Sequence, residues 1–310
     1  MQIVYWFFWK KWKGIVLVDG GHSIYGITRK IMGSINFTVI PPTEALSCDV
    51  EYFRISEYAG KESLSIKVCP NGFPGIVFQH SNGQHAIKNI TVSSGRIVQM
   101  PCTLFLYGQV TELSVMNFKK SPYTTVQAIL KPHALNTLFG MDASKLTNAS
   151  MEYSEFNAET LNTQLLSAKS NNEYVTLFED FLLQMLGTHQ SRDILVEECL
   201  EYIHSNISMV TVKDLTEKSY LSERQFEKRF VRIVGVSPQF FIRVKRFNEA
   251  MRLIDSGQYE RLSDVAYALN YFDQSHFIRD IKAFSGITPK SISQKVNDFH
   301  HDQIGSSYLL

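Results

Sequence analysis

Residues 273–289 decide the fold, and their sequence is DQSHFIRDIKAFSGITP. An earlier segment, residues 222–238, has the sequence SERQFEKRFVRIVGVSP and repeats the same pattern at an offset of 51 positions. Three apolar positions spaced at 0, 4 and 7 are shared by the two segments: Phe226, Phe230 and Ile233 in the first, and Phe277, Ile281 and Phe284 in the second. This spacing places three side chains on one face of a helix. We therefore expect two copies of one helical unit.

Each copy also carries signals for the start and the end of its helix. Ser222 followed by Gln225 forms a capping box, and Asp273 is a suitable N-cap for the second copy. We expect the helix before the second copy to begin at Ser263, with Asn270 taking a positive φ in the turn that follows. A glycine ends each helix, and a Ser-Pro or Thr-Pro pair starts the next: Gly235, Ser237 and Pro238, and Gly286, Thr288 and Pro289. These signals predict two helix-turn-helix units.

Three further helices complete the predicted C-terminal domain. Residues 193–205 form one with Val196, Leu200 and Ile203 inward, and residues 212–219 form another. Residues 239–255 form a connecting helix of roughly 25 Å at about 1.5 Å per residue. A strut of this length could hold two recognition helices about one DNA turn apart, roughly 34 Å, so that both enter successive major grooves.

The outward positions of the two recognition helices are the candidate DNA contacts. Arginine suits guanine, glutamine suits adenine, and lysine suits phosphates. We expect His276 to pack or cap rather than contact a base. The candidates are Arg224, Glu227 and Lys228 in the first helix, and Gln274, Ser275, Arg279 and Lys282 in the second.

The C-terminal part resembles the DNA-binding domain of the AraC/XylS family of transcription regulators. The resemblance covers residues from about 190 to 295 and rests on LSERQFEKRF with GVSP, and on ALNYFDQSHFIRDIKAFSGITP. The turn glycine usual in each unit is replaced by Tyr220 in the first and Asn270 in the second. Residues 35–160 resemble, more weakly, the β-rich N-terminal domain of a subset of these regulators. That second resemblance implies a sensing or dimerisation domain.

Charge is unevenly distributed along the chain. The net charge is +1, with 31 Lys+Arg and 30 Asp+Glu, but residues 213–295 hold 15 basic and 10 acidic side chains, a net +5. The remainder carries −4. A mildly basic C-terminal part favours a polyanionic partner. The four cysteines show no CxxC pair, which fits a reducing cytoplasm and signals neither a zinc site nor a disulfide framework.

The N-terminal part predicts an all-β sandwich or jelly roll. Short β-rich runs between residues 37 and 118 alternate with Pro-Pro, Asn-Gly, Pro-Gly and Ser-Gly turns. His80 and His85 lie on a turn at a spacing unlike an HxH metal motif, so we expect a solvated hairpin loop, no metal and no cofactor. Residues 3–9, IVYWFFW, match neither a transmembrane helix nor a signal peptide. We expect either an interfacial or sheet-edge strand here, or a start codon assigned too far upstream, with Met32 as the functional start.

The sequence thus predicts an α+β chain: an extension of uncertain structure at 1–31, a β-rich domain at 32–158, amphipathic helices at 159–187, the DNA-binding domain at 188–296, and a flexible tail at 297–310. The expected function is sequence-specific binding of double-stranded DNA in the cytoplasm, without enzymatic activity. Further partners to consider are RNA polymerase, an unknown small-molecule effector and a second copy of the chain. The rival prediction is an alkyl-transfer enzyme fused to a DNA-binding domain. Cys102, its nearest candidate nucleophile, lacks the flanking His and Arg that would activate the thiol.

Overall fold

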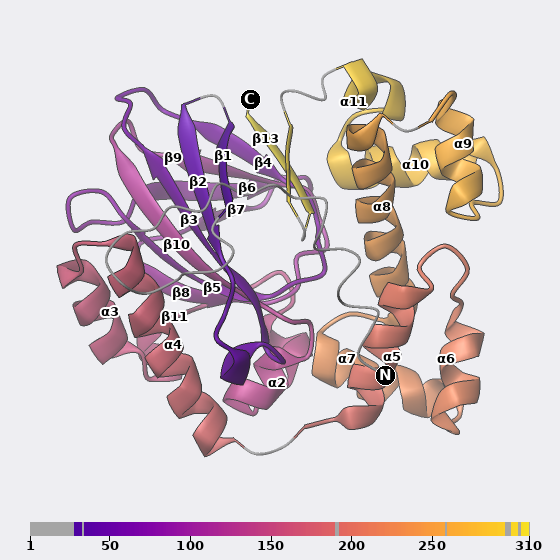
Figure 1. Ribbon diagram of the computed structural model, residues 1–310, viewed down its shortest axis with the longest axis horizontal. Coiled ribbons are helices and arrows are strands. Elements are labelled where there is room, and N and C mark those ends of the chain that lie inside the picture. Colours follow the sequence, from indigo (N-terminus) through magenta and orange to yellow (C-terminus); the bar gives the residue numbers. More distant parts are fainter. Residues whose placement is uncertain are drawn as a thin grey trace.

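The computed structural model describes residues 28–32, 34–189, 192–257, 259–294, 299–302 and 305–309. A β-rich N-terminal domain lies beside an all-helical domain that is built along one long helix, α8 (Pro238–Ser256) (Figure 1). The α+β architecture expected from the sequence is confirmed.

Two antiparallel sheets form the N-terminal domain. One has the strand order β1-β2-β3-β10-β5-β8-β11, and the other has the order β12-β13-β4-β9-β6-β7. Their strands are β1 (Thr28–Met32), β2 (Ile35–Ile40), β3 (Val50–Tyr58), β4 (Ser65–Val68), β5 (Gly75–His80), β6 (Ile87–Val92), β7 (Ile97–Gln99), β8 (Leu104–Tyr107), β9 (Ser114–Phe118), β10 (Tyr123–Leu130), β11 (Ser150–Glu152), β12 (Phe299–Asp302) and β13 (Gly305–Leu309). Most of these strands coincide with the predicted runs.

Strand β10 is the main element that the sequence reading did not predict. It pairs with β3 on one side and β5 on the other, and seven of its eight residues are buried. A strand covered on both faces shows no alternation of apolar and polar residues, so its sequence YTTVQAIL lacks the pattern of a half-buried strand.

Among the residues that the structure describes, three α-helices and three short 3-10 helices complete this domain: α2 (Ala134–Phe139), α3 (Glu159–Ser167) and α4 (Asn171–Thr188), and η2 (Glu44–Leu46), η3 (Ala143–Leu146) and η4 (Tyr153–Phe156). The apolar face of α4 packs on the first sheet, with the rings of Phe53 and Phe178 6.3 Å apart. Ser170 caps α4, which explains the break in the predicted helical stretch. Helix α4 runs through Thr188, so the connection to the helical domain begins later than expected.

The two ends of the chain differ from the prediction. In place of a flexible tail at 297–310, β12 and β13 form a hairpin, and Ser307 pairs with Val68 of β4. The added strand satisfies backbone groups that an edge strand would otherwise leave unpaired. At the other end, β1 begins inside the predicted extension, whereas the apolar run at residues 3–9 lies outside the described residues.

The helical domain contains α5 (Ile194–Ser205), α6 (Val212–Ser219), α7 (Glu223–Val234), α8, α9 (Leu262–Ala268), α10 (Gln274–Ser285) and α11 (Pro289–Gln294). The predicted caps at Ser222 and Asp273 are confirmed, with Asp273 Oδ1 accepting a hydrogen bond from the His276 amide at 2.6 Å. The predicted cap at Ser263 is wrong. The N-cap of α9 is Arg261, two residues earlier, because the third residue after it, Asp264, accepts the Arg261 amide at 2.7 Å. None of the described helices combines the length and apolarity needed to span a bilayer.

Candidate DNA-binding face

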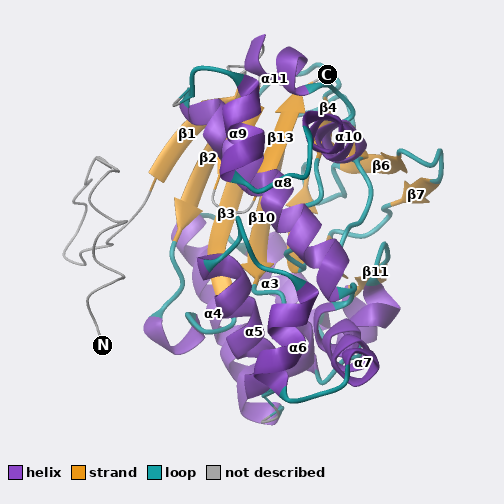
Figure 2. Cartoon of the chain, turned by 90° about the vertical axis from the view of Figure 1, so that its right-hand side faces the viewer, coloured by secondary structure: helices purple, strands orange, loops and turns teal. Residues whose placement is uncertain are grey.

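Helix α8 positions both recognition helices. The ring of Phe241 on α8 lies 5.8 Å from Phe230 on α7, and the ring of Phe247 lies 5.2 Å from Phe284 on α10. The apolar positions predicted to face inward on α7 and α10 are all buried. Figure 2 shows α7 and α10 nearly end-on, on the same side of α8 and toward its opposite ends. Both helices therefore lie on one side of α8.

An ion pair joins each recognition helix to another helix of the domain. In the first unit, Arg229 Nε on α7 donates to Oδ2 of Asp193, the N-cap of α5, at 2.7 Å. In the second unit, Arg243 Nη2 on α8 donates to the buried Asp280 Oδ1 on α10, also at 2.7 Å. Hydrogen bonding to these carboxylates raises the pKa of both arginines. Arg229 and Asp280 are 51 positions apart, so the same place in the repeat is occupied by opposite charges.

All seven predicted DNA contacts lie on exposed surface of α7 and α10. They are Arg224, Glu227 and Lys228 on α7, and Gln274, Ser275, Arg279 and Lys282 on α10. The face of α10 forms one open depression, lined by Ser275, Ile278, Arg279, Lys282 and Ala283. His276 does not belong to this face: its ring packs edge-on against Tyr271, and its Nε2 lies 3.7 Å from Asp280 Oδ2.

Three exposed apolar side chains near these helices were not among the predicted contacts. Ile278 lies between Ser275 and Lys282 on the α10 face and is 38% exposed. An apolar side chain at such a position suits the methyl group of thymine. Tyr220 and Phe272, in the two turns, are 95% and 93% exposed. The sequence signal for Ile278 was present, because its helical position faces outward, but only polar residues were selected.

The turns of the two units differ by one residue. Tyr220 takes the left-handed conformation, with φ 53°, two positions before the N-cap Ser222. Asn270 does the same, also with φ 53°, three positions before the N-cap Asp273. Asparagine tolerates this conformation better than tyrosine. The tyrosine adopts it with its side chain almost wholly in solvent, so the missing glycine does not prevent the first turn from forming.

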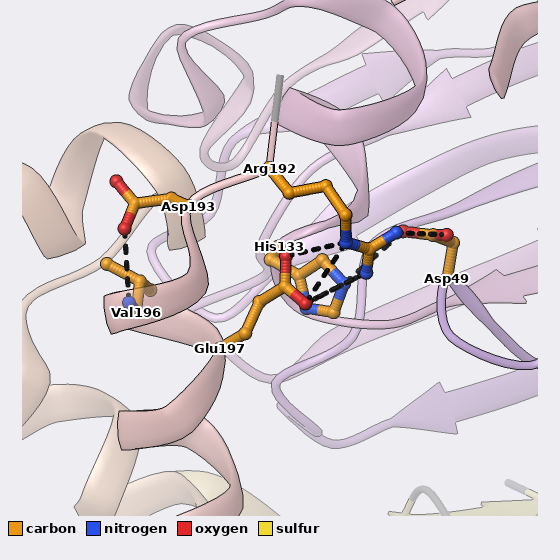
Figure 3. Close-up of polar contacts among 6 residues, drawn as sticks. All are labelled: Asp49, His133, Arg192, Asp193, Val196 and Glu197. Atoms are coloured by element: carbon orange, nitrogen blue, oxygen red, sulfur yellow. Dashed lines mark hydrogen bonds and ion pairs between the residues drawn. The ribbon is translucent and has the colours of Figure 1, made fainter. Parts of the chain in front are cut away.

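The start of the helical domain is attached to the N-terminal domain through Arg192 (Figure 3). Its guanidinium donates to Asp49 Oδ2 at 2.9 Å and to Glu197 Oε2 at 2.8 Å, and His133 Nε2 lies 3.3 Å from Asp49 Oδ1. Burial acts to raise the pKa of Asp49, but hydrogen bonds and charge from His133 and Arg192 outweigh it and lower the pKa. The cluster joins residues from both domains and places the first turn of α5.

The residues considered for other chemistry do not form a reactive site. Burial, with a further contribution from Glu152, raises the pKa of the Cys102 thiol to about 11, which opposes formation of a thiolate at neutral pH. His80 Nε2 lies 3.2 Å from the Tyr174 hydroxyl. Across the described residues, no three His, Cys, Asp or Glu side chains gather as a metal site would require.

Comparison with known proteins found two family models and several solved structures. A model described as a helix-turn-helix domain matches residues 215–295, and a model described as a domain of unknown function (DUF6597) matches residues 38–152. No curated protein matches. The structure is similar to ToxT from Vibrio cholerae, with 12% identity, a TM-score of 0.44, and coverage of 78% of this chain and 97% of that one.

Two further solved structures complete the comparison. Unsaturated fatty acid-bound ToxT from Vibrio cholerae strain SCE256 has 14% identity and a TM-score of 0.43 over 78% of this chain and 94% of that one. A probable AraC family transcriptional regulator from Rhodopseudomonas palustris has 27% identity and a TM-score of 0.31, over 34% of this chain and 98% of that one.

These TM-scores are below 0.5, so the type of the C-terminal domain is inferred from the match to the helix-turn-helix family model and from the sequence of residues 215–295. The matched segment holds α8 and both recognition helices, with the spacing and caps expected of the resemblance. Residues 215–295 therefore form a helix-turn-helix domain of the AraC type, with two helix-turn-helix units on one connecting helix.

Proposed function

We propose that each chain binds one asymmetric DNA site, with α7 and α10 entering successive major grooves on one face of the duplex. The observation that carries this proposal is the position of both recognition helices on the same side of α8 (Figure 2). Helix α8 has 19 residues and is about 28 Å long. That length is of the same order as one DNA turn of roughly 34 Å.

In the first half-site, α7 presents a mixed set of charges. Arg224, near the N-terminus of the helix, suits the O6 and N7 atoms of guanine, and Glu227 can accept from the N4 amine of cytosine. Lys228 suits a phosphate, where it fixes the register without reading sequence. Glu223 and Glu227 also stabilise the N-terminal part of the helix through its dipole.

In the second half-site, α10 presents an uncharged N-terminal turn followed by cations. Gln274 suits the N6 and N7 atoms of adenine, and Ser275 can bond to any base. Arg279 suits guanine, and Lys282 suits a phosphate. Helix α10 has no exposed carboxylate in its first turn, in contrast to α7.

Corresponding positions on the two helices carry different chemistry. At the offset of 51 residues, Arg224 corresponds to Ser275, Glu227 to Ile278 and Lys228 to Arg279. Two faces with different donors, acceptors and apolar groups select different bases. The two half-sites should therefore differ in sequence, and no palindrome is needed within the site of one chain.

Two single substitutions test whether α7 and α10 each recognise the bases of one half-site. We expect Arg224→Ala and Arg279→Ala each to relax base preference by about 1 to 3 kcal/mol, in different halves of the site. The measurement is the affinity of each variant for every single-base change in a duplex selected by the wild-type protein. Equal losses on the selected duplex and on random DNA would show that both arginines only position the protein.

The remaining partners stay predictions. The N-terminal domain is the part that would sense a small-molecule effector or pair two chains, and dimerisation would raise affinity through effective concentration. Sedimentation of the full chain, with and without a selected duplex, distinguishes a monomer from a dimer. Contact with RNA polymerase is expected only of a regulator that activates transcription.

A further inference from the structure

The mutual orientation of α7 and α10 depends on the shape of α8. Helix α7 packs on α8 through Phe230 and Phe241, and α10 packs on it through Phe284, whose ring lies 5.9 Å from Phe240 and 5.2 Å from Phe247. A small bend of a helix between two such attachment points moves one recognition helix relative to the other. Any group that holds both attachment points at once therefore limits this motion.

The N-terminal domain contacts the first unit at the end of α7. Thr147 Oγ1 donates a hydrogen bond to the carbonyl of Gly235 at 2.6 Å. Gly235 has φ 95°, and a Cβ atom there would lie 3.1 Å from the Ala143 carbonyl oxygen. Glycine thus permits both the left-handed turn and the close approach of η3 to the end of α7.

A second contact holds the middle of α8. Lys245 Nζ donates to the carbonyl of Asn71 at 3.1 Å and lies 3.4 Å from the centroid of the Phe73 ring. Asn248 Nδ2 lies 3.3 Å from the Pro70 carbonyl and 3.4 Å from that of Asn71. Burial lowers the pKa of Lys245 to about 7, and the negative charge of Glu51 acts in the opposite direction.

One buried side chain connects these two contacts. Gln109 is only 2% exposed, and its Nε2 donates to the carbonyl of Gly72 at 3.0 Å, inside the loop that holds Lys245. Its Cγ would lie 3.2 Å from a Cβ atom at Gly235. Asn71 Oδ1 accepts from the Phe73 amide at 2.9 Å, which stabilises the same loop. The two contacts therefore belong to one packed part of the N-terminal domain.

The C-terminal hairpin adds a third connection on this side. Strand β13 pairs with β4, and Cys69, which follows β4 directly, joins the apolar cluster of α8 and the second unit. Figure 1 shows the hairpin between the β domain and α8. The N-terminal domain thus reaches the first unit through Gly235 and the second unit through Cys69 and the hairpin.

We propose that the N-terminal domain acts as an interdomain brace, formed by Asn71, Phe73 and Thr147 against Gly235, Lys245 and Asn248, that sets the half-site spacing accepted by the two recognition helices. This inference rests on the two-groove function proposed above. It assigns the N-terminal domain a role in specificity that needs no contact with DNA. Its residues are positioning residues, which act through α8.

The test is a series of duplexes that keep both selected half-sites and change the distance between them by one base pair in either direction. One base pair moves a half-site by about 3.4 Å and turns it by about 35° around the axis. We expect wild-type protein to lose about 10-fold to 100-fold in affinity on the altered duplexes, because one helix then loses its base contacts.

The full-length variant carrying Thr147→Val and Lys245→Met should lose less than about threefold on the same duplexes, because α8 can then adapt. Matched controls are Thr163→Val and Lys120→Met, both at exposed positions of the N-terminal domain away from α8. They should keep the wild-type spacing profile. If the double variant does not fold, as judged by its thermal unfolding, Asn248→Leu alone serves the same purpose.

Each outcome has a distinct meaning. Identical spacing profiles for wild type and the brace variants would overturn the brace and leave the two-groove function intact. Tighter binding by the variants at every spacing would overturn it as well, because the contacts would then inhibit binding instead of setting spacing. A wild-type protein that tolerates every spacing would overturn the two-groove function itself, and the brace with it.

Discussion

Replacing Arg192 with methionine should uncouple the two domains at a cost that follows from the surroundings of Asp49. The Asp49 side chain is 1% exposed, and Arg192 supplies its 2.9 Å hydrogen bond and a neighbouring positive charge. Removing one member of a buried ion pair typically costs about 3 to 5 kcal/mol. Because Arg192 is 30% exposed and His133 remains 3.3 Å from Asp49, we expect a cost below this range, about 2 to 3 kcal/mol.

The assay is denaturant unfolding of the full chain at pH 7. The transition is monitored by far-ultraviolet circular dichroism, because both the strands of one domain and the helices of the other contribute to this signal. Arg252→Met is the matched control, because Arg252 pairs with Glu249 on the exposed surface of α8 and should change stability by at most about 0.5 kcal/mol. The double variant Asp49→Asn with Arg192→Met should recover part of the loss, since it removes both charges together.

The effect should also depend on pH in a defined direction. The pKa of folded Asp49 is lowered, so its contribution to stability is present above the unfolded pKa near 4 and is lost as the pH falls through the folded pKa. The difference between wild type and Arg192→Met should therefore shrink in strong acid. A loss below about 0.5 kcal/mol at pH 7, or a loss that does not change with acid, would refute this reasoning.

Two further substitutions test the roles of single side chains on the DNA-binding face. Lys228→Ala should weaken binding about equally on all sequences and reduce the slope of log K against log salt by about 1, and an unchanged slope would exclude a phosphate contact. Ile278→Ala should remove sensitivity to replacing thymine by uracil at one position of the second half-site; wild-type protein indifferent to every such replacement would exclude a methyl contact.

The helical domain could be predicted almost completely because its signals are local. The apolar spacing of Phe226, Phe230 and Ile233, the capping box at Ser222 and the glycine at Gly235 each act within one or two helical turns. The helix ends that these signals predict for α7 agree with the observed ends to within one residue. Local signals also placed the seven candidate contacts on exposed surface, although their roles toward DNA stay predictions.

The features that escaped prediction depend on contacts between distant parts of the chain. Strand β10 is defined by its two neighbours, β3 on one side and β5 on the other, and the hairpin of β12 and β13 is defined by the edge of β4. The cluster around Arg192 joins Asp49 and Glu197, which are far apart in sequence. No periodicity within a short window carries such information. Local signals can also be ambiguous. Ser263 is a suitable N-cap, but the hydrogen bond from the Arg261 amide to Asp264 places the N-cap of α9 at Arg261.

The central claim is that one chain supplies two different recognition helices to one asymmetric site, and the stoichiometry and symmetry of the selected site test it most directly. The measurement is analytical ultracentrifugation of the protein with the duplex that it selects from a random pool. We predict a non-palindromic site of roughly two helical turns, with one chain occupying both half-sites. If the N-terminal domain dimerises, two such sites should be occupied, one per chain. A strict complex of two chains on a single palindrome, with each chain contacting one half-site, would contradict the account.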